Sequence, residues 1–319
     1  MDEIVQKGLK RKVVIVGAGL VGSTYAYSLS QSGLADEIVL IDRNDELVKG
    51  QVLDLVHGES FVPTVSIREG SSEDYSDAQL IVITAGSAQK PGETRLQLLK
   101  KNADIVGNIA GEVSRQGSKG VMLIVSNPVD VMTWVALKSS GWERGRVIGS
   151  GTVLDSARFR YLLAKHCGID VHNVHAYILG EHGDSEFAAW SMTNVAGMVI
   201  DNYCPVCNKC SDWKSERASI EQQVRESAYH IINAKGATHF AVGLAMVRIT
   251  AAILRKQNSV MTVSVFLNGE FGLRDVCLSV PSIVTDTGVT RVIAASLSDQ
   301  EMKLLRRSAG IIKEAIDSL

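Results

Sequence analysis

The chain has 319 residues, of which 45% are hydrophobic and 21% are charged, an ordinary composition for a globular protein long enough to form two lobes. A net charge of −2 without a long basic run argues against nucleic acid or an anionic membrane as the main partner. The N-terminus lacks the apolar core of a signal peptide, and no stretch has the roughly 20 apolar residues that span a bilayer. We therefore expect a cytoplasmic protein.

Residues 12–42 have the pattern of a strand, turn, helix and strand that bind a dinucleotide. A β-branched run at 13–16 predicts a buried strand, and Gly17, Gly19 and Gly22 follow it as G-x-G-x-x-G. Such glycines allow a tight turn and a close approach to pyrophosphate, which the N–H groups of the helix terminus bind. A second apolar run ends in Asp42, whose carboxylate would accept from a ribose 2′-hydroxyl and repel the 2′-phosphate of NADP. The pattern predicts NAD as the cofactor.

The rest of the first half alternates strands with helices. Apolar runs at 80–86, 121–125 and 147–148 predict buried strands, with a shorter strand near Val65. Helical patterns at 50–57 and about 96–116 lie between them. This alternation predicts an α/β fold with a doubly wound parallel (Rossmann) sheet over residues 1–151.

The pattern changes after Gly151, where we predict a second, α+β domain over residues 152–319. Helices are expected at 153–166, at 215–235 and from Thr238 to about 255, and residues 174–179 are extended. Strands at 259–267 and 273–280 flank Asn268-Gly269, which predicts an antiparallel hairpin. A capping box at 298–301 predicts the last helix. The residues expected to face inward on the 215–235 helix and on the last helix are Ile220, Val224, Ala228, Ile231, Ile232, Met302, Leu305, Ala309, Ile312 and Ile316.

Five cysteines, an odd number, argue against a complete disulfide framework and fit a reducing compartment. Three of them, Cys204, Cys207 and Cys210, have the spacing C-x-x-C-x-x-C. Zinc or an iron–sulfur cluster usually needs a fourth ligand, and in the neighbouring sequence Asp212 alone has a suitable side chain. The simpler interpretation is a loop with reactive thiols, and we predict no metal.

His182 is the candidate for proton transfer, because it lies in a polar connection between glycines and acids at 180–184. Imidazole titrates near pH 6.5, so it can accept a hydroxyl proton and return it. Asp155 is the expected partner of its other nitrogen, because Asp155 and Arg158 share a helical face at i, i+3. The alternatives are a structural histidine and a surface ion pair.

Six segments in order, GAGLVGS, AQKPGETR, SNPVD, GSGTVLDSARFR, GEHGDSE and KGATHF, carry a resemblance over nearly the whole chain. Through them the sequence resembles bacterial NAD-dependent L-lactate dehydrogenases. The resemblance implies that His182 gives and takes the proton and that Asp155 orients it. It implies that Arg158 holds the substrate carboxylate by a two-pronged contact and that Arg95, on a mobile loop, polarises the carbonyl.

The resemblance also implies roles for further positions. Asn127 would hydrogen-bond the substrate oxygen near the nicotinamide, and Thr238 would line the substrate pocket. Without the resemblance, Arg95 would be a solvated charge, Asn127 a turn residue and Thr238 a helix cap. The positions implied to contact NAD, besides the three glycines and Asp42, are Val21, Gly86, Ser126, Asn127 and Ser150.

Gln89 predicts the substrate, because the similar malate dehydrogenases carry arginine at the matching position. A neutral amide leaves a second carboxylate unpaired in a closed site, at a cost of several kcal/mol. Pyruvate and L-lactate therefore fit better, although the adjacent Lys90 keeps malate open. Related 2-hydroxyisocaproate dehydrogenases are a further alternative.

Arg160 and His175 match positions that bind fructose 1,6-bisphosphate between subunits in allosteric bacterial members, and the family suggests a homotetramer. The alternatives are a helix-surface arginine and a strand histidine.

Two rival classes remain. Tyr161 and Lys165 fit the Y-x-x-x-K pair of short-chain dehydrogenases, but that family spaces its glycines as G-x-x-x-G-x-G, unlike this chain. A dinucleotide-binding protein without turnover would not require His182, Asp155, Arg158 and Arg95 together.

Overall fold

The computed structural model describes residues 10–88, 92, 94–207, 209, 211–294 and 296–319, except for the side chains of 205 and 207. Among these residues, no helix combines the length and the apolar character needed to cross a membrane. The prediction for Gln89 and Lys90 lies outside the described residues, as does that for Cys210 and for the side chain of Cys207.

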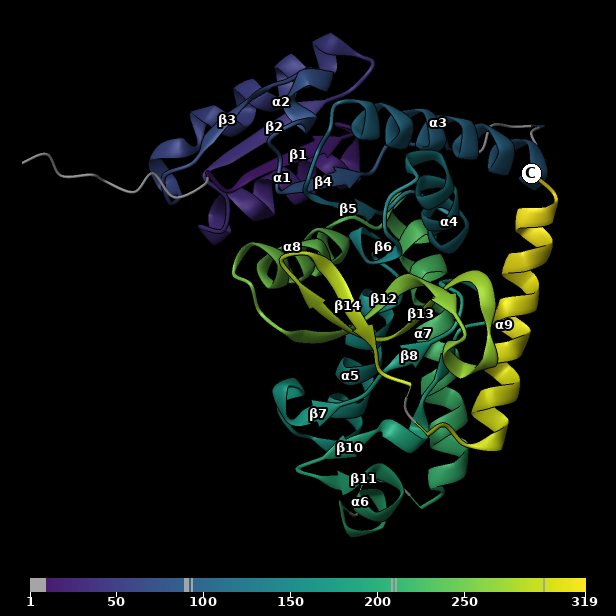
Figure 1. Cartoon of the computed structure of the whole chain (residues 1–319). Coiled ribbons are helices and arrows are strands. Elements are labelled where there is room, and N and C mark those ends of the chain that lie inside the picture. Colours follow the sequence, from purple (N-terminus) through teal and green to yellow (C-terminus); the bar gives the residue numbers. More distant parts are fainter. Residues whose placement is uncertain (1–9, 89–91, 93, 208, 210, 295) are drawn as a thin grey trace, which may run out of the picture.

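A nine-stranded sheet runs through the molecule in the order β14-β13-β12-β6-β5-β4-β1-β2-β3 (Figure 1). Six strands of the first half are parallel and take the order 3-2-1-4-5-6, which is the doubly wound order of a dinucleotide-binding fold. The predicted parallel sheet is therefore confirmed. These strands are β1 (Lys12–Val16), β2 (Glu37–Ile41), β3 (Ser66–Glu69), β4 (Leu80–Ile83), β5 (Val121–Ile124) and β6 (Val147–Gly149).

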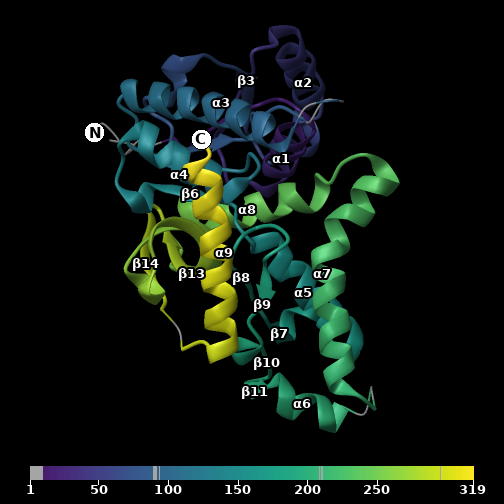
Figure 2. The same ribbon diagram turned by 90° about the vertical axis from the view of Figure 1, so that its right-hand side faces the viewer.

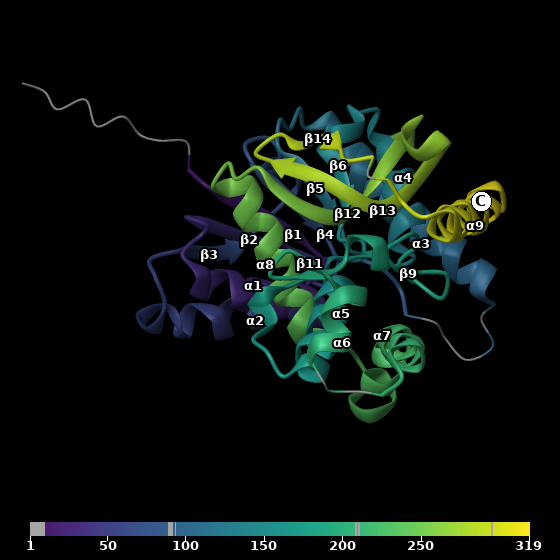
Figure 3. The same cartoon turned by 90° about the horizontal axis from the view of Figure 1, so that it is seen from below.

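Four helices connect the parallel strands: α1 (Leu20–Ser32), α2 (Asp45–His57), α3 (Arg95–Arg115) and α4 (Val129–Ser140). Helix α1 packs against α8 (Phe240–Leu254), and α3 packs against α4 on the other face of the sheet (Figure 3). Helix α2 begins five residues before the predicted start, because the side chain of Asn44 caps it by accepting from the N–H of Leu47. Gly50 lies inside this helix and does not start it.

The second half adds three antiparallel strands to the same sheet, so the predicted α+β character is confirmed. These strands are β12 (Ser259–Asn268), β13 (Arg274–Thr285) and β14 (Gly288–Val292), and β12 meets β6 where Ser264 pairs with Gly149. The junction is tight, because a Cβ atom on Gly149 would lie 2.4 Å from the hydroxyl of Thr133. Gly151 has φ +53° and would place a Cβ 2.5 Å from the backbone nitrogen of Ser264.

The remaining elements build the outer part of the second half (Figures 1 and 2). Helix α5 (Val153–Cys167) packs against α7 (Trp213–Lys235) over a small second core that is separate from the main one. Helix α9 (Asp299–Asp317) runs along the side, and its predicted capping box is confirmed by the hydrogen bonds between Ser298 and Glu301. The other elements are α6 (Ile200–Cys207), β7 (Val174–His175), β8 (Ile178–Leu179), β9 (Phe187–Ala188), β10 (Asn194–Val195) and β11 (Met198–Val199).

One local prediction is wrong. Ile232 was expected to face inward but is 45% exposed, since it lies near the end of α7, beyond the second core. The segment predicted to be extended at 174–179 contains two short strands, β7 and β8, which belong to different sheets. The predicted antiparallel hairpin is confirmed, and a 3₁₀ turn at Glu270–Gly272 lies between β12 and β13.

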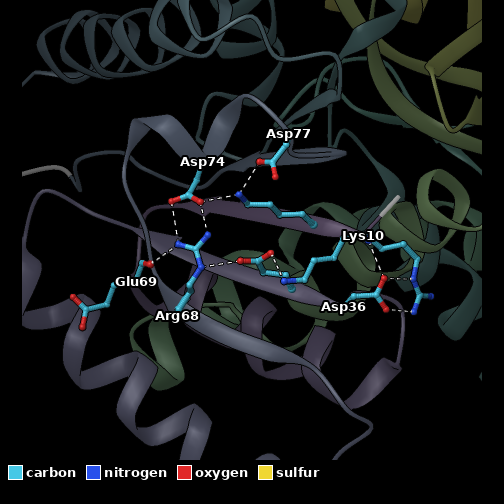
Figure 4. Close-up of polar contacts among 9 residues, drawn as sticks. Lys10, Asp36, Arg68, Glu69, Asp74 and Asp77 are labelled. Carbon is cyan, nitrogen blue, oxygen red and sulfur yellow. Dashed lines mark hydrogen bonds and ion pairs between the residues drawn. The ribbon is translucent and has the colours of Figure 1, made fainter. Parts of the chain in front are cut away.

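A network of ion pairs joins the first residues of β1 and β2 to β3 and to the 3₁₀ turn that follows it (Figure 4). Lys12, which is 5% exposed, donates to Asp74 and Asp77 at 2.7 Å each. Arg68 on β3 bonds Glu37 on β2 at 2.7 Å and also pairs with Asp74. Pairing allows these charges to remain ionised although several of them are enclosed.

Candidate active site

A cavity of about 520 Å³ opens at the carboxyl ends of the parallel strands and is lined by the glycine-rich turn. Gly17, Gly19, Asp42 and Gly86, four of the residues predicted to contact NAD, line it. Ligands of doubly wound sheets bind at this edge, where the strand order reverses. The cavity is therefore the place where the dinucleotide fits.

The three glycines of the turn are required for different reasons. Gly17 has φ +111°, and a Cβ on Gly22 would lie 1.9 Å from the carbonyl oxygen of Gly17, so both are fixed by the fold itself. A Cβ on Gly19 would meet no atom within 4 Å. Gly19 precedes α1 and leaves its first N–H groups without a side-chain cap. The open space and these donors suit a phosphate group.

The carboxylate of Asp42 is held by the turn that it faces. One oxygen accepts from the N–H of Ala18 at 2.8 Å, and the other accepts from the N–H of Asn44 at 3.1 Å. These bonds orient an acceptor at the end of β2, where a ribose hydroxyl of bound NAD would lie. The residues of this edge therefore fit the cofactor.

The remaining predicted contacts lie on the same edge. Ser126 and Asn127 follow β5, and Ser150 follows β6, where its N–H donates to the carbonyl of Ile124 at 2.8 Å. The hydroxyl of Ser126 donates to the carbonyl of Ala85 at 2.5 Å. Val21 is half-buried in the first turn of α1.

Asn102 was missed in the sequence. It is 4% exposed on α3, accepts from the N–H of Ser87 at 2.8 Å and donates to the carbonyl of Asn127 at 3.1 Å. It therefore joins the loop after β4 to the loop after β5. A polar residue on the buried face of the predicted 96–116 helix was the available signal.

His182, Asp155 and Arg158 come together in the second half. The Nδ1 of His182 lies 2.7 Å from one oxygen of Asp155, and Arg158 donates to the other oxygen at 2.7 Å. Asp155 is 2% exposed, whereas the side chain of His182 is 28% exposed and that of Arg158 is 13% exposed. With Nδ1 bonded to the carboxylate, Nε2 is the ring atom available for proton exchange.

The charge of Asp155 controls the protonation of His182. Burial lowers the pKa of the imidazole, but the charge and the hydrogen bond of Asp155 outweigh burial and raise it to about 9. Burial raises the pKa of Asp155 in turn, and His182 and Arg158 outweigh that effect and keep it below its usual range. Asp155 therefore stays ionised and stabilises the imidazolium.

Asp130 positions the backbone of His182 and was missed in the sequence. It is 1% exposed in the first turn of α4, accepts from the N–H of His182 at 2.7 Å and accepts from the hydroxyl of Ser264 at 2.5 Å. Burial raises the pKa of Asp130 to about 6 against these two hydrogen bonds, which lower it. Asp130 thus links α4 and β12 to the histidine loop. An acidic side chain among the apolar residues at the start of this helix was a signal that the sequence offered.

Glu186 is a second acidic residue that was missed in the sequence, and it is 5% exposed. One carboxylate oxygen of Glu186, one of Asp155 and a ring nitrogen of His182 lie within 4.8 Å of one another. Burial and the neighbouring charge of Asp155 raise the pKa of Glu186 well above its usual value. Two carboxylates this close in a buried place do not both ionise. Asp155 has the cationic partners, so the cluster favours the ionised form of Asp155 and disfavours that of Glu186.

Of the other predicted substrate residues, Arg95 and Thr238 are described and Gln89 lies outside the described residues. Arg95 is exposed as the first residue of α3, directly after its capping residue Thr94. The hydroxyl of Tyr229 on α7 donates to Asp184 at 2.8 Å, and this hydrogen bond raises the pKa of Tyr229. Thr238 is half-buried between α7 and α8.

Arg160 and His175 line a second cavity of about 440 Å³ on the outer side of α5, together with His172 and Arg248. Arg160 donates to the carbonyl of Ala176 at 3.3 Å. Tyr161, the first residue of the Y-x-x-x-K pattern, is 60% exposed on the same helix, and it lines neither cavity.

The chain matches two family models, the lactate/malate dehydrogenase NAD binding domain over residues 11–149 and the lactate/malate dehydrogenase alpha/beta C-terminal domain over residues 152–319. It is 58% identical to an L-lactate dehydrogenase of Treponema denticola over 97% of this chain and 98% of that protein.

Solved structures with 42% identity match the whole fold. A lactate dehydrogenase from a Medee basin deep-sea metagenome library has a TM-score of 0.95, covering 98% of this chain and 99% of that one. The minor L-lactate dehydrogenase of Enterococcus mundtii in its ligand-bound form has a TM-score of 0.94 with the same coverage. The predicted dehydrogenase and its cofactor, NAD, are confirmed. The chain belongs to the NAD-dependent L-lactate dehydrogenases of the lactate/malate dehydrogenase family.

Proposed function

We propose that this protein reduces pyruvate to L-lactate, and oxidises L-lactate in reverse, with His182 as the proton donor and acceptor. The observation that carries this proposal is the 2.7 Å contact between Nδ1 of His182 and Asp155, with Arg158 on the same carboxylate. Such a cluster supplies both a proton and a cation for a small monocarboxylate.

NADH, when bound along the carboxyl edge of the parallel strands, supplies the hydride. The guanidinium of Arg158 holds the substrate carboxylate, and Asn127 accepts or donates at the substrate oxygen. The Nε2 proton of His182 passes to the carbonyl oxygen, and Asp155 stabilises the charge of the ring before the transfer. The guanidinium of Arg95, the first residue of α3, stabilises the polarised carbonyl. Thr238 borders the pocket.

The substrate assay follows the loss of NADH absorbance with pyruvate, oxaloacetate and a branched 2-oxo acid. If Gln89 faces the substrate, kcat/KM for pyruvate should exceed that for oxaloacetate by at least about 100-fold, because a second carboxylate would be left unpaired. An equal rate with oxaloacetate would favour malate dehydrogenase instead. Tight NADH binding without turnover of any of the three acids would favour the non-catalytic alternative.

We further propose that fructose 1,6-bisphosphate binds the cavity at Arg160 and His175, between subunits of a cytoplasmic homotetramer. Support comes from four side chains that can carry positive charge around about 440 Å³, a suitable setting for phosphate groups. Burial lowers the pKa of Arg160, and a bound phosphate group would raise it again by favouring the charged guanidinium.

The sugar bisphosphate should raise the rate at low pyruvate by at least about fivefold at pH 7. The double variant Arg160→Gln/His175→Asn should lose this response and keep the rate without effector. The matched control is Arg255→Gln, which changes an exposed arginine outside the cavity. An undiminished response of the double variant would refute the assignment.

A further inference from the structure

Thr238, which the proposed function places beside the substrate, lies in the short connection between α7 and α8. Helix α7 ends at Lys235 and α8 begins at Phe240, so the connection consists of residues 236–239. Gly236 has φ +85°, in the left-handed region, and ends α7. A group that fixes the other end of this short connection therefore fixes the position of Thr238 as well.

His239 is the residue that fixes this other end. It precedes α8, but its side chain does not cap that helix. Its Nδ1 lies 3.0 Å from the hydroxyl oxygen of Thr24 on α1, and its Nε2 lies 2.9 Å from Nζ of Lys235. An ammonium group has donors only, so Nε2 accepts from Lys235, and Nδ1 carries the ring proton and donates to Thr24. The imidazole therefore bonds the end of α7 and the middle of α1 at the same time.

Thr24 belongs to the helix whose first turn faces the coenzyme cavity. It follows Gly22 of the glycine-rich turn closely, and it shares one helical face with Val21 at i, i+3. Thr24 and His239 are 215 positions apart in the chain and come from the two different halves of the molecule. Their hydrogen bond therefore joins the coenzyme helix of the first half to the neighbour of Thr238 in the second.

The surface between α1 and α8 is tightly packed around this bond. Figure 2 shows α8 beside α1. A Cβ atom on Gly243 would lie 3.1 Å from the methyl group of Thr24, so the two helices approach each other closely there. The hydroxyl of Tyr25 lies 2.6 Å from that of Thr250, in a buried place. Because packed side chains leave little room for adjustment, a displacement of α1 is transmitted to the start of α8.

We propose that His239 is a positioning residue that couples the binding of the coenzyme to the binding of the substrate. This inference rests on the proposed function, in which Thr238 borders the substrate pocket. NADH bound at the glycine-rich turn fixes the start of α1, and the bond from His239 to Thr24 then holds Thr238 where the 2-oxo acid binds. Neither His239 nor Thr24 lines the coenzyme cavity, so both residues act through their neighbours.

The first test is the steady-state kinetics of His239→Phe, which keeps a ring and removes both hydrogen bonds. At saturating NADH, the KM for pyruvate should rise by at least about fivefold, because Thr238 is no longer held. The value of kcat should change by less than about twofold, since the pair of His182 and Asp155 is untouched. His239→Asn places a polar atom near the position of Nδ1 and should restore the KM to within about twofold of the wild type. A residue that only supported the fold would lower the Tm without this separation of KM from kcat.

The same bond can be removed from the other helix. Thr24→Val replaces the hydroxyl with a methyl group and should raise the KM as His239→Phe does, whereas Thr24→Ser keeps the hydroxyl and should behave like the wild type. The double variant with both changes should be no worse than either single variant, because each removes the same bond. The matched control is Thr290→Val, which changes an exposed threonine of β14. If His239→Phe does not fold, the two Thr24 variants decide.

The second test measures the coupling itself by NADH fluorescence titration, without and with saturating oxamate, an amide analogue of pyruvate. The factor by which oxamate tightens NADH binding should fall by at least about fivefold in His239→Phe and in Thr24→Val. The affinity for NADH alone should change by less than about twofold. An unchanged KM and an unchanged factor in both variants would overturn the proposal. A wild type without turnover of any 2-oxo acid would instead refute the proposed function, and the titration would still decide whether His239 couples the two sites.

Discussion

Replacing His182 with asparagine should lower kcat for pyruvate reduction by about 10²–10⁴-fold, because the amide has no proton to transfer near neutral pH. NADH affinity should change by less than about twofold, since the coenzyme cavity is lined by residues of the first half only. Steady-state kinetics and NADH fluorescence titration measure the two quantities separately.

The matched control for this variant is His57→Asn, because His57 is exposed in the last turn of α2 and lines neither cavity. That variant should turn over pyruvate like the wild type. Equal turnover of the His182 and His57 variants would remove His182 from the mechanism.

The pH profile gives an independent check on His182. Asp155 raises the pKa of the imidazole to about 9, so its charged form persists below that pH. Pyruvate reduction needs this form and should fall as the pH rises through about 9. Lactate oxidation needs the neutral ring and should rise over the same range. Binding of the coenzyme or substrate will shift the midpoint, but the opposite signs should remain.

Replacing Asp130 with alanine should reduce both stability and turnover. The change leaves the N–H of His182 and the hydroxyl of Ser264 without their acceptor in a buried place. We expect the free energy of unfolding to fall by about 3 kcal/mol, from two unsatisfied donors, in urea denaturation. Turnover should fall about 100-fold, because the loop that carries His182 loses an anchor.

Two controls accompany the Asp130 variant. Asp130→Asn keeps the shape and one acceptor oxygen, and should lie between the wild type and the alanine variant in both measurements. Asp104→Ala removes an exposed acid of α3 and should change the free energy of unfolding by less than about 0.5 kcal/mol. Wild-type stability and turnover for Asp130→Ala would show that the anchor has no energetic role.

Local patterns in the sequence predicted most of the fold. Strands β1, β2, β4 and β5 are built on apolar runs, and the glycine-rich turn and the capping box at Ser298 are short-range signals. The errors arose where distant contacts decide. Strand β14 (Gly288–Val292) has two consecutive exposed residues, Thr290 and Arg291, and its sequence has no apolar run that would predict a strand. Ile232 fits the apolar spacing of α7, but it is not buried in either hydrophobic core.

The candidate site was predictable only in part, for the same reason. The polar segment at 180–184, the i, i+3 spacing of Asp155 and Arg158, and the resemblance pointed to these residues, and the structure brings them together. Asp130 lies 52 residues from His182, and only the folded chain shows its hydrogen bond to that backbone. Glu186 lies in the same segment as His182, but its proximity to Asp155 depends on how the segment folds back.

The hydrogen-bonded continuity between β6 and β12 limits how such enzymes can be recombined. Because Ser264 pairs with Gly149 and packs on Gly151, a chimera spliced at position 151 would separate two strands that share one sheet. An exchange of substrate pockets between such enzymes would have to include β12 together with β6, or be confined to loops outside the sheet.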